Sequence, residues 1–556
     1  DLGGDNDSFL RLVQVRDLLA GQGWFDLTQY RMGPEGGFVM HWSRLVDAPI
    51  AGIMLAVSAL SGNAGTGETA ALFLWPFLLA VASLFLMLRA ARAYGGEAAL
   101  LPALVIGCGA LYFVTIFEPA TLDHHNVQVV LTLAALAGVL DPARRSGAGL
   151  LAGISCALMM AVGMETLPCV AAIGLLVALL FIFGDAADRD VARGFGMGFG
   201  GAGAIAFVAT VPPEGWGIVA CDSYSIAHFA VAALAGAGMA LAASVGPAHR
   251  TLPRRLLAMF LLGLLVSVLV GTAFPQCLTD PYASLDPRLK SHWLDLVREA
   301  QPLSKLLAQH PGIVVARYVT PLLGLVLAVS AAVGPARRRQ DIVVAVLLAT
   351  TLAVGAWQVR GTTLAIVLAV LPLSAWIGRA RSVAATSASP RAAALMIFAW
   401  LASFNMTWAV GAAWVGASLD PKSEAETAEV SACTGETDLA RLATLPRSTL
   451  LAVSNLGAPV LRYSPHRVLA GPYHRNVAGN LVALDAFLGP TDRAKALAVE
   501  HDVDFIVLCP GNTETTMFAD ANPDGLLAAL IRGEVPAWLE PTGEGAALRL
   551  YRVRPD

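Results

Sequence analysis

Long apolar runs separated by short polar connections recur along the first three quarters of this chain of 556 residues. A run of about 20 apolar residues is the length that an α-helix needs to cross the hydrocarbon core of a bilayer. Hydrophobic residues make up 56% of the chain and charged residues only 14%, against about 25% charged in soluble domains. The sequence therefore excludes a conventional soluble enzyme and predicts a polytopic membrane protein that is mainly α-helical.

The apolar runs predict about 12 membrane-spanning helices. We expect them near residues 70–91, 98–117, 127–140, 147–163, 168–184, 195–213, 224–246, 255–273, 313–333, 341–357, 362–378 and 390–414. Arginines cluster in alternate connections, which is the pattern that the positive-inside rule gives to cytoplasmic loops. These are Arg89 and Arg92, Arg144 and Arg145, Arg189 and Arg193, Arg250, Arg254 and Arg255, Arg337 to Arg339, and Arg379 and Arg381.

The remaining connections then lie on the external side of the membrane. They are residues 1–69, 118–126, 214–223, 274–312 and 358–361, together with the tail after residue 415. The apolar run 48–63 is short for a span, so we expect an interfacial or re-entrant helix there. An external start of the chain also requires one further helix upstream of Asp1, which brings the expected number of spans to about 13.

The last quarter of the chain has a different composition, because charged residues are much denser there. Strand-like segments at 448–455 and 504–510 alternate with helix-like segments at 481–489 and 491–502. We therefore expect a mixed α/β domain over residues 416–556, outside the bilayer. Residues 1–415 form the membrane domain in this interpretation.

Seven cysteines show no CxxC pair and no Cys/His spacing of a metal site, which excludes zinc ribbons and iron–sulfur centres. Cys433 and Cys509, both in the tail, either form a disulfide in an oxidising compartment or remain as two buried thiols. The net charge of −4 and the scattered arginines give no indication of nucleic-acid binding.

Ionisable residues gather at the expected external ends of the spans, where their energetic cost makes them candidates for function. Asp5 and Asp7 precede a segment with helical apolar periodicity, which predicts an amphipathic helix on the membrane surface. Its apolar residues are Phe9, Leu10, Leu12, Val13, Val15, Leu18 and Leu19. Metal binding by Asp7 and capping of this helix by Asp7 or Ser8 are both open.

A second group occupies the external connection 118–126. Asp123 and His125 are separated by one residue, so in an extended turn both side chains project to the same side and can bind one divalent cation. We favour this ligand role over a solvated helix cap. His124, between them, is a secondary candidate.

Two further candidates lie in the long external loop and in the last external turn. Glu299 and Gln301 stand in the loop, where the structural alternative is a salt bridge between a carboxylate and Arg298 or Lys305. Arg360 lies at the external end of a span. It either reaches out to lipid phosphates or binds the phosphates of a lipid-linked substrate through its planar guanidinium.

The tail contributes His474 and Arg475, in the polar segment 471–476. This segment is either a polar turn or a contact for an acceptor or a phosphate. We favour the turn.

These groups occur in the order, and on the face, of the motifs of oligosaccharyltransferase catalytic subunits of the PglB/AglB type, which the chain resembles from residue 7 to about 415. Residues 6–21 resemble the first acidic motif of that family, 122–125 its second, and 297–302 its motif in the fifth external loop. The resemblance implies that Asp7, Asp123 and His125 bind the metal, with Asp5 secondary. It also implies that Glu299 faces metal and acceptor, and that Arg360 holds the donor phosphates. Asp7 and Glu299 are the catalytic residues in this interpretation, since one of them would orient the acceptor and could also take its proton.

The resemblance further implies a GT-C fold and transfer of a sugar or oligosaccharide from a polyprenyl (pyro)phosphate to an acceptor, with inversion and with Mn²⁺ or Mg²⁺. The implied partners are the polyprenyl-linked donor, membrane lipid, and a glycan, lipid or protein acceptor. The implied location is the inner membrane of a bacterium, with the active site and the tail in the periplasm.

Two positions depart from the family. The tail has no WWDYG motif, its only tryptophan being Trp538, and Leu296 stands where the family has a hydroxyl residue. We therefore expect the donor chemistry to be kept and the acceptor to differ. Protein N-glycosylation is the alternative within this class. A polyprenyl-glycan transporter or flippase is the alternative outside it, disfavoured because transporters place their polar sites near the bilayer midplane.

Overall fold

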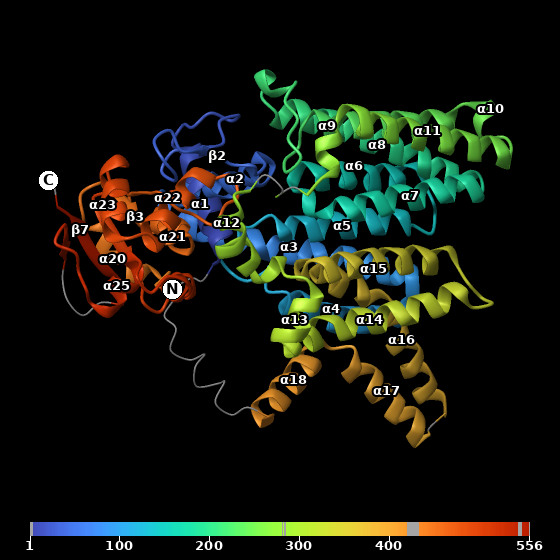
Figure 1. The fold of residues 1–556 in the computed structure, drawn as a ribbon. Coiled ribbons are helices and arrows are strands. Elements are labelled where there is room, and N and C mark those ends of the chain that lie inside the picture. Colours follow the sequence, from blue (N-terminus) through green and yellow to red (C-terminus); the bar gives the residue numbers. More distant parts are fainter. Residues whose placement is uncertain are drawn as a thin grey trace.

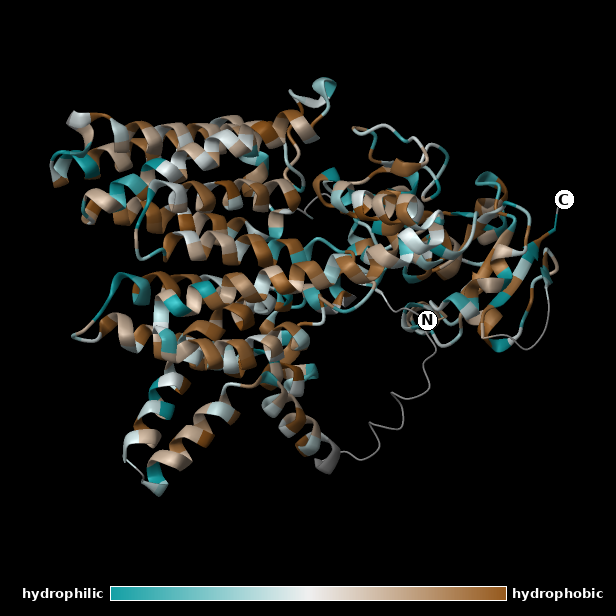
Figure 2. Ribbon diagram, turned by 180° about the vertical axis from the view of Figure 1, so that it is seen from behind, coloured by the Kyte–Doolittle hydropathy of each residue, from teal (hydrophilic) through white to brown (hydrophobic). Residues whose placement is uncertain are grey.

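The computed structural model describes residues 4–280, 282, 285–387, 389–419, 433–542 and 547–554. A bundle of long helices forms the larger part, and a smaller unit with a β-sheet lies at one end of it (Figure 1). The two parts differ in surface character. Hydrophobic residues follow the helices of the bundle, whereas hydrophilic residues are interspersed through the smaller unit (Figure 2).

Each expected span up to residue 378 contains a helix. The helices are α3 (Ala64–Gly95), α4 (Leu100–Phe113), α5 (His125–Val139), α6 (Ser146–Val162), α7 (Leu167–Phe183), α8 (Ala186–Thr210), α9 (Ile226–Ser244), α11 (Leu252–Ala273), α14 (Pro311–Val333), α15 (Arg339–Trp357) and α16 (Thr362–Ser387). Within the described residues, nine helices are long and apolar enough to cross a membrane, while α4, α5 and α6 are shorter apolar helices. The chain is thus a multi-pass membrane protein that is mainly helical.

The expected single span at 390–414 is broken in the structure, and its crossing of the membrane stays a prediction. Helices α17 (Pro390–Ala402) and α18 (Asn405–Leu419) meet at an angle of 79°, and both point away from the bundle (Figure 1). The side-chain amide of Asn405 donates to the hydroxyl of Thr320 on α14 at 2.6 Å. This polar contact holds the break, because it fixes the first residue of α18 to a neighbouring helix.

Helix α1 (Asn6–Leu19) is not the membrane-surface helix that its apolar pattern predicted. Residues 8–15 are buried all round, because α1 lies between the sheet-containing unit and helices α2 (Arg44–Ser61) and α3. Its N-cap is Asp5, whose carboxylate accepts a hydrogen bond from the backbone N–H of Ser8 at 2.8 Å. Of the two alternatives left open for Asp7, capping of the helix by Asp7 or Ser8 is therefore excluded.

Helix α2 contains the short apolar run 48–63, and it is long enough by composition to cross a bilayer. It packs against α3, and an interfacial or re-entrant position remains a prediction. A buried charge group marks its first turns. Asp47 binds Arg11 of α1 at 2.9 Å and Arg44 at 3.0 Å, and all three side chains are almost fully buried.

The sheet-containing unit confirms the expected mixed α/β tail. Its five strands are ordered β4-β3-β5-β7-β6, with β3 (Thr449–Leu451) parallel to β4 (Arg467–Val468) and β5 (Phe505–Leu508), and β7 (Arg549–Val553) antiparallel to β5 and β6 (Leu539–Pro541). The helices around it are α20 (Glu436–Ala443), α21 (Ser454–Tyr463), α22 (Val477–Leu488), α23 (Thr491–Glu500), α24 (Thr513–Ala521) and α25 (Leu526–Arg532).

The segment before α2 shares the core of this unit. Phe9, Met32 and Trp42 are buried in one cluster with residues of the sheet and its helices. A short hairpin of β1 (Thr28–Gln29) and β2 (Phe38–Val39) belongs to the same segment. Of the two alternatives for Cys433 and Cys509, the disulfide is the one that forms.

The other end of the bundle carries arginine-rich connections, as their alternation predicted. The connections after α5, α7 and α14 lie at the end away from the sheet (Figure 1). Asp188 pairs with Arg339 and, at 3.2 Å, with Arg144. Arg338 pairs with Asp341 at 2.7 Å.

Candidate active site

The start of α1 and the connection before α5 lie together. The hydroxyl of Ser8 accepts a hydrogen bond from the backbone N–H of Leu122 at 3.0 Å, which brings Asp7 close to Asp123. None of the described residues donates a hydrogen bond to the carboxylate of Asp7. Because Asp5 caps the helix, Asp7 is left available to a ligand.

Asp123, His124 and His125 form one compact group. Oδ1 of Asp123 lies 2.6 Å from Nδ1 of His124, and Oδ2 lies 3.5 Å from Nε2 of His125. One ligand atom from each lies within 4.8 Å of the other two. Asp7 is not a member of this tight group, although its charge interacts with Asp123 and His124.

Glu165 completes this group on the side of α7, and the sequence reasoning missed it. Its Oε1 lies 3.4 Å from Nε2 of His124, and its Oε2 accepts a hydrogen bond from Gln128 at 2.8 Å. Gln128 also contacts Nδ1 of His125 at 3.2 Å. The signal was present, because Glu165 is an acidic residue between two expected spans on the external side.

Negative charge is concentrated in this part of the site. Burial, together with the charges of Asp123, Asp5 and Glu299, raises the pKa of Asp7 well above its usual value. Burial also opposes ionisation of Asp123, but the neighbouring imidazoles of His124 and His125 outweigh it and hold its pKa far below the usual range. Burial disfavours the imidazolium of His124, yet Asp123 and Glu165 raise its pKa to about 10. The group is therefore arranged to hold positive charge.

The long loop before α14 is fixed to the turn that carries Arg360. The carbonyl of Gln301 accepts a hydrogen bond from the backbone N–H of Val359 at 3.0 Å, and the guanidinium of Arg360 donates to Oε1 of Gln358 at 2.8 Å. Arg360 interacts electrostatically with Glu165 and with Glu299. The side chains of Leu296 and Arg298 lie outside the described part of the chain.

Two adjoining cavities meet at these residues. One, of about 820 Å³, extends among the helices and has apolar walls such as Phe113, Val129, Ile313 and Leu364. The other, of about 430 Å³, lies under the sheet-containing unit. Both are lined by Asp5, His41, His125, Glu165, Tyr282, Glu299, Arg360 and His474. Asp123 lines the first cavity and Asp7 the second, so the structure brings the predicted principal site residues to one junction.

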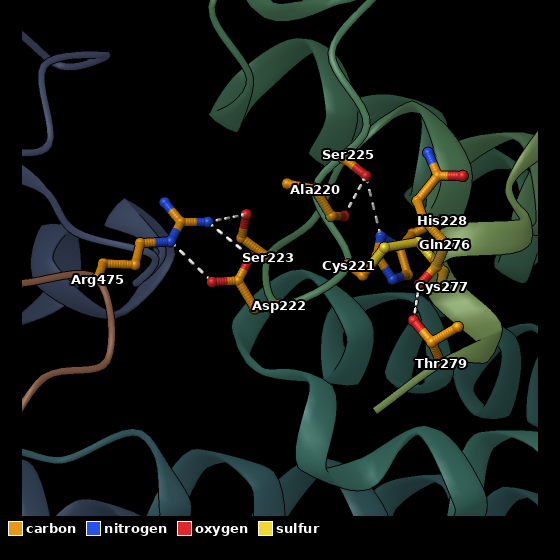
Figure 3. Close-up of a disulfide and its surroundings, with 10 residues drawn as sticks. All are labelled: Ala220, Cys221, Asp222, Ser223, Ser225, His228, Gln276, Cys277, Thr279 and Arg475. Carbon is orange, nitrogen blue, oxygen red and sulfur yellow. Dashed lines mark hydrogen bonds and ion pairs between the residues drawn. A yellow bond between two sulfur atoms is a disulfide. The ribbon is translucent and has the colours of Figure 1, made fainter. Parts of the chain in front are cut away.

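A second polar group borders both cavities. Ligand atoms of His41, Asp222 and His474 lie within 4.8 Å of one another, and Arg475 binds Asp222 beside the Cys221–Cys277 disulfide (Figure 3). Segment 471–476 is thus a turn, as favoured, but it also makes a specific contact. The sequence reasoning missed His41 and Asp222, since each is an isolated polar residue without a motif around it.

No protein-family model matches the sequence, and no curated protein matches it. Solved structures do match. The oligosaccharyltransferase AglB of Archaeoglobus fulgidus, in complex with an inhibitory peptide and a dolichol-phosphate, is 15% identical, with a TM-score of 0.67 over 95% of this chain and 68% of that one. The Archaeoglobus fulgidus enzyme tethered to an acceptor peptide with the NVT sequon is 13% identical, with a TM-score of 0.65 over 99% and 70%.

The same enzyme in complex with Zn and sulfate is 15% identical, with a TM-score of 0.60 over 95% of this chain and 67% of that one. At such identities the likeness is one of fold. It confirms the predicted fold, a helical membrane domain followed by an α/β domain, and leaves the expected number of spans a prediction. The chain has the GT-C membrane fold of the archaeal oligosaccharyltransferase.

Proposed function

We propose that this chain is a membrane glycosyltransferase that moves a sugar or oligosaccharide from a polyprenyl phosphate or diphosphate to an acceptor on the external face. The observation that carries this proposal is the junction of the two cavities. The apolar walls of the larger cavity suit a lipid tail, and the mixed polar and apolar walls of the smaller one suit an acceptor. Acids, imidazoles and an arginine line the place where the two meet.

The structural neighbours support a donor and an acceptor of these kinds. One was solved with a dolichol-phosphate and another with an acceptor peptide. We propose a polyprenyl-linked donor for this chain, and a glycan, lipid or protein as the acceptor. An apolar cavity between helices keeps such a lipid tail out of water while its head group reaches the external surface.

A divalent cation fits the residues at the junction. Asp7, Asp123 and His125 offer two carboxylates and one imidazole, and Asp7 lacks a hydrogen-bond donor among the described residues. These residues would hold the ion. One nitrogen among oxygen ligands favours Mn²⁺ over Mg²⁺, which prefers oxygen alone. When bound, the ion supplies positive charge for the phosphate that leaves the sugar.

The remaining groups of the junction have separate tasks. Arg360 binds the donor phosphates through its planar guanidinium, which Gln358 orients. Asp7 and Glu299 orient the acceptor opposite the leaving phosphate. Attack from that side inverts the configuration at the anomeric carbon.

We also propose that the active site and the domain 416–556 lie in the periplasm of a bacterium, with residues 1–415 as the membrane domain. The cysteines support this orientation. Both disulfides, Cys221–Cys277 and Cys433–Cys509, lie outside the bundle helices, whereas the free cysteines Cys108, Cys156 and Cys169 lie within them. Disulfides form and persist in oxidising compartments such as the periplasm.

The test is mass spectrometry of glycoproteins, surface glycans and glycolipids from a strain that lacks the gene, complemented with wild type or variants. We expect one glycan product to disappear in the deletion strain and to return with wild type only. Asp7→Ala, Asp123→Ala and Glu299→Gln variants should not restore it. Full restoration by these variants at equal membrane levels would refute the proposal.

A further inference from the structure

His474 and Asp222 form a pair whose geometry is fixed from two sides. Nε2 of His474 lies 2.8 Å from Oδ2 of Asp222. Arg475 binds both oxygens of the same carboxylate, with Nε 2.7 Å from Oδ2 and Nη2 2.7 Å from Oδ1 (Figure 3). A bidentate arginine holds a carboxylate in one orientation, so Asp222 presents a defined face to the imidazole.

The backbone at Asp222 is anchored as well. The adjacent Cys221 is bonded to Cys277, which ties the connection before α9 to the start of the long external loop, and Arg475 also donates to Ser223 at 3.0 Å (Figure 3). Three external segments that are distant in sequence therefore meet at this carboxylate. This arrangement positions the side chain of His474.

His474 points its other nitrogen away from Asp222. Because Asp222 accepts the hydrogen on Nε2, Nδ1 carries the lone pair. No hydrogen bond to Nδ1 is formed by the described residues. His474 lines both cavities at their junction, which is where a donor head group and an acceptor would meet.

A second imidazole, that of His41, lies beside the pair, and its electrostatic surroundings differ from those of His474. The ring of His41 lies 4.5 Å from that of His474, and burial together with His474 and Arg475 lowers the pKa of His41 well below its usual value. Burial opposes ionisation of Asp222, but its hydrogen bonds with His474 and Arg475 outweigh this and hold its pKa far below the usual range. The charge of Asp222 acts on both imidazoles, but His474 is the one that is hydrogen-bonded to it.

We propose that His474 is the general base that accepts the proton of a hydroxyl acceptor, and that Asp222 is its positioning residue. This inference rests on the proposed function. In the step, the acceptor oxygen bonds to the anomeric carbon as the bond from that carbon to the donor phosphate oxygen breaks. The bonding electrons leave with the phosphate, the acceptor proton moves to Nδ1 of His474, and water later takes that proton.

The pair favours a hydroxyl over a carboxamide as the acceptor. A hydroxyl must lose its proton as it attacks, and an imidazole with an aspartate partner removes such a proton near neutral pH. A carboxamide nitrogen shares its lone pair with the carbonyl group and is far less acidic than an imidazolium. A fixed imidazole base would therefore serve an alcohol of a sugar, a lipid, or a serine or threonine side chain.

The test uses membranes that contain the full chain and their own lipid-linked donor, with the unglycosylated acceptor purified from the deletion strain. The variants are His474→Gln, His474→Ala and Asp222→Asn. His501→Gln is the matched control, since His501 lies in the same domain and lines neither cavity. Turnover is measured from low to high pH, because Asp222, His41, Arg475 and Tyr282 all face His474.

We expect His474→Gln to lower kcat by about 100-fold and Asp222→Asn by at least about 10-fold, with donor affinity nearly unchanged. The loss of activity toward low pH should vanish in His474→Gln, and added imidazole should partly restore His474→Ala. The sugar in the product should be linked to oxygen. The control should behave as wild type.

Three results would overturn the inference while leaving the proposed function intact: an amide-linked product, an unchanged pH profile in His474→Gln, or equal losses of kcat and donor affinity without imidazole rescue. The last result would assign the pair a purely structural role. Absence of any transfer by wild type, with no product missing from the deletion strain, would instead reject the proposed function itself.

Discussion

The two ends of the helix bundle both carry ionisable side chains but use them differently. At the arginine-rich end, Asp188 is shared by Arg144 and Arg339, and Asp341 pairs with Arg338. At the other end, Asp7, Glu299 and Arg360 form no ion pair within 4.0 Å among the described residues. They line a cavity instead.

This difference separates charges that hold the fold from charges that await a ligand. A carboxylate buried with its arginine is neutralised within the protein, and loss of either partner leaves an uncompensated charge. A carboxylate on a cavity wall, next to other acids, gains most of its stabilisation when a cation or substrate arrives. The same residue types therefore have opposite sensitivities to mutation at the two ends.

The largest expected effect tests directly whether the charges at the two ends serve activity and stability, respectively. Asp7→Asn weakens the proposed metal site, so we expect transfer activity to fall by about 10³-fold or more, with little change in thermal stability, because Asp7 has no ion pair among the described residues to lose. The matched variant at the other end, Asp188→Asn, should lower the melting temperature and leave the turnover of the folded protein unchanged. EDTA should reproduce the effect of Asp7→Asn in wild type, and Mn²⁺ should reverse the effect of EDTA. Wild-type activity in excess EDTA would contradict the metal role.

Paired charges also occur beside the site. Their mutation should lower stability, as we expect for the paired charges at the arginine-rich end of the bundle. Asp47 neutralises the buried Arg11 and Arg44. Asp47→Asn should lower the free energy of unfolding by about 3 kcal/mol or more, because two buried guanidinium groups lose their carboxylate. Chemical denaturation in detergent measures the change. A variant as stable as wild type would show that water or lipid compensates these arginines.

The two disulfides sharpen the comparison in another way. The Cys433–Cys509 disulfide joins two residues that are 76 positions apart in the sequence, and neither cysteine lines either cavity. Replacing both cysteines by serine should cost about 2 to 4 kcal/mol of stability and leave turnover intact. The double serine variant of Cys221 and Cys277 should lower turnover as well, since Cys221 precedes Asp222. Equal turnover in the two double variants would contradict the anchoring role of Cys221–Cys277.

The helices were predictable because each span corresponds to about 20 consecutive apolar residues. The arginines predict an orientation in the membrane, and that orientation stays a prediction. Asp7, Asp123 and Arg360 were found for a related reason, since each stands at the end of an expected span, whereas Glu299 was found within the long loop 274–312. Glu165 obeys the same rule and was overlooked.

Contacts between distant segments were not predictable in this way. Asp222 and His474 are 252 residues apart, and no local pattern relates them. The sequence of helix α1 has an amphipathic pattern, yet its polar side is buried too. It is buried because α1 packs against a domain that lies more than 400 residues later in the chain. The hydrogen bond from Arg16 to the carbonyl of Arg462 is one of these contacts. The bend before α18 depends on Asn405 reaching α14, a contact that hydropathy does not encode.

The smallest expected effect concerns the pH dependence of stability near Asp222. Its pKa is lower in the folded protein than the usual value near 4, because of His474 and Arg475. Its charge therefore contributes stability above about pH 4, and this contribution is lost as the pH falls further. The free energy of unfolding of wild type should exceed that of Asp222→Asn by about 1.5 kcal/mol at neutral pH. This difference should become smaller only below about pH 4. A difference that stays constant down to pH 3 would mean that Asp222 contributes packing rather than charge. Asp222 would then belong neither to the paired charges that stabilise the fold nor to the charges that bind a ligand.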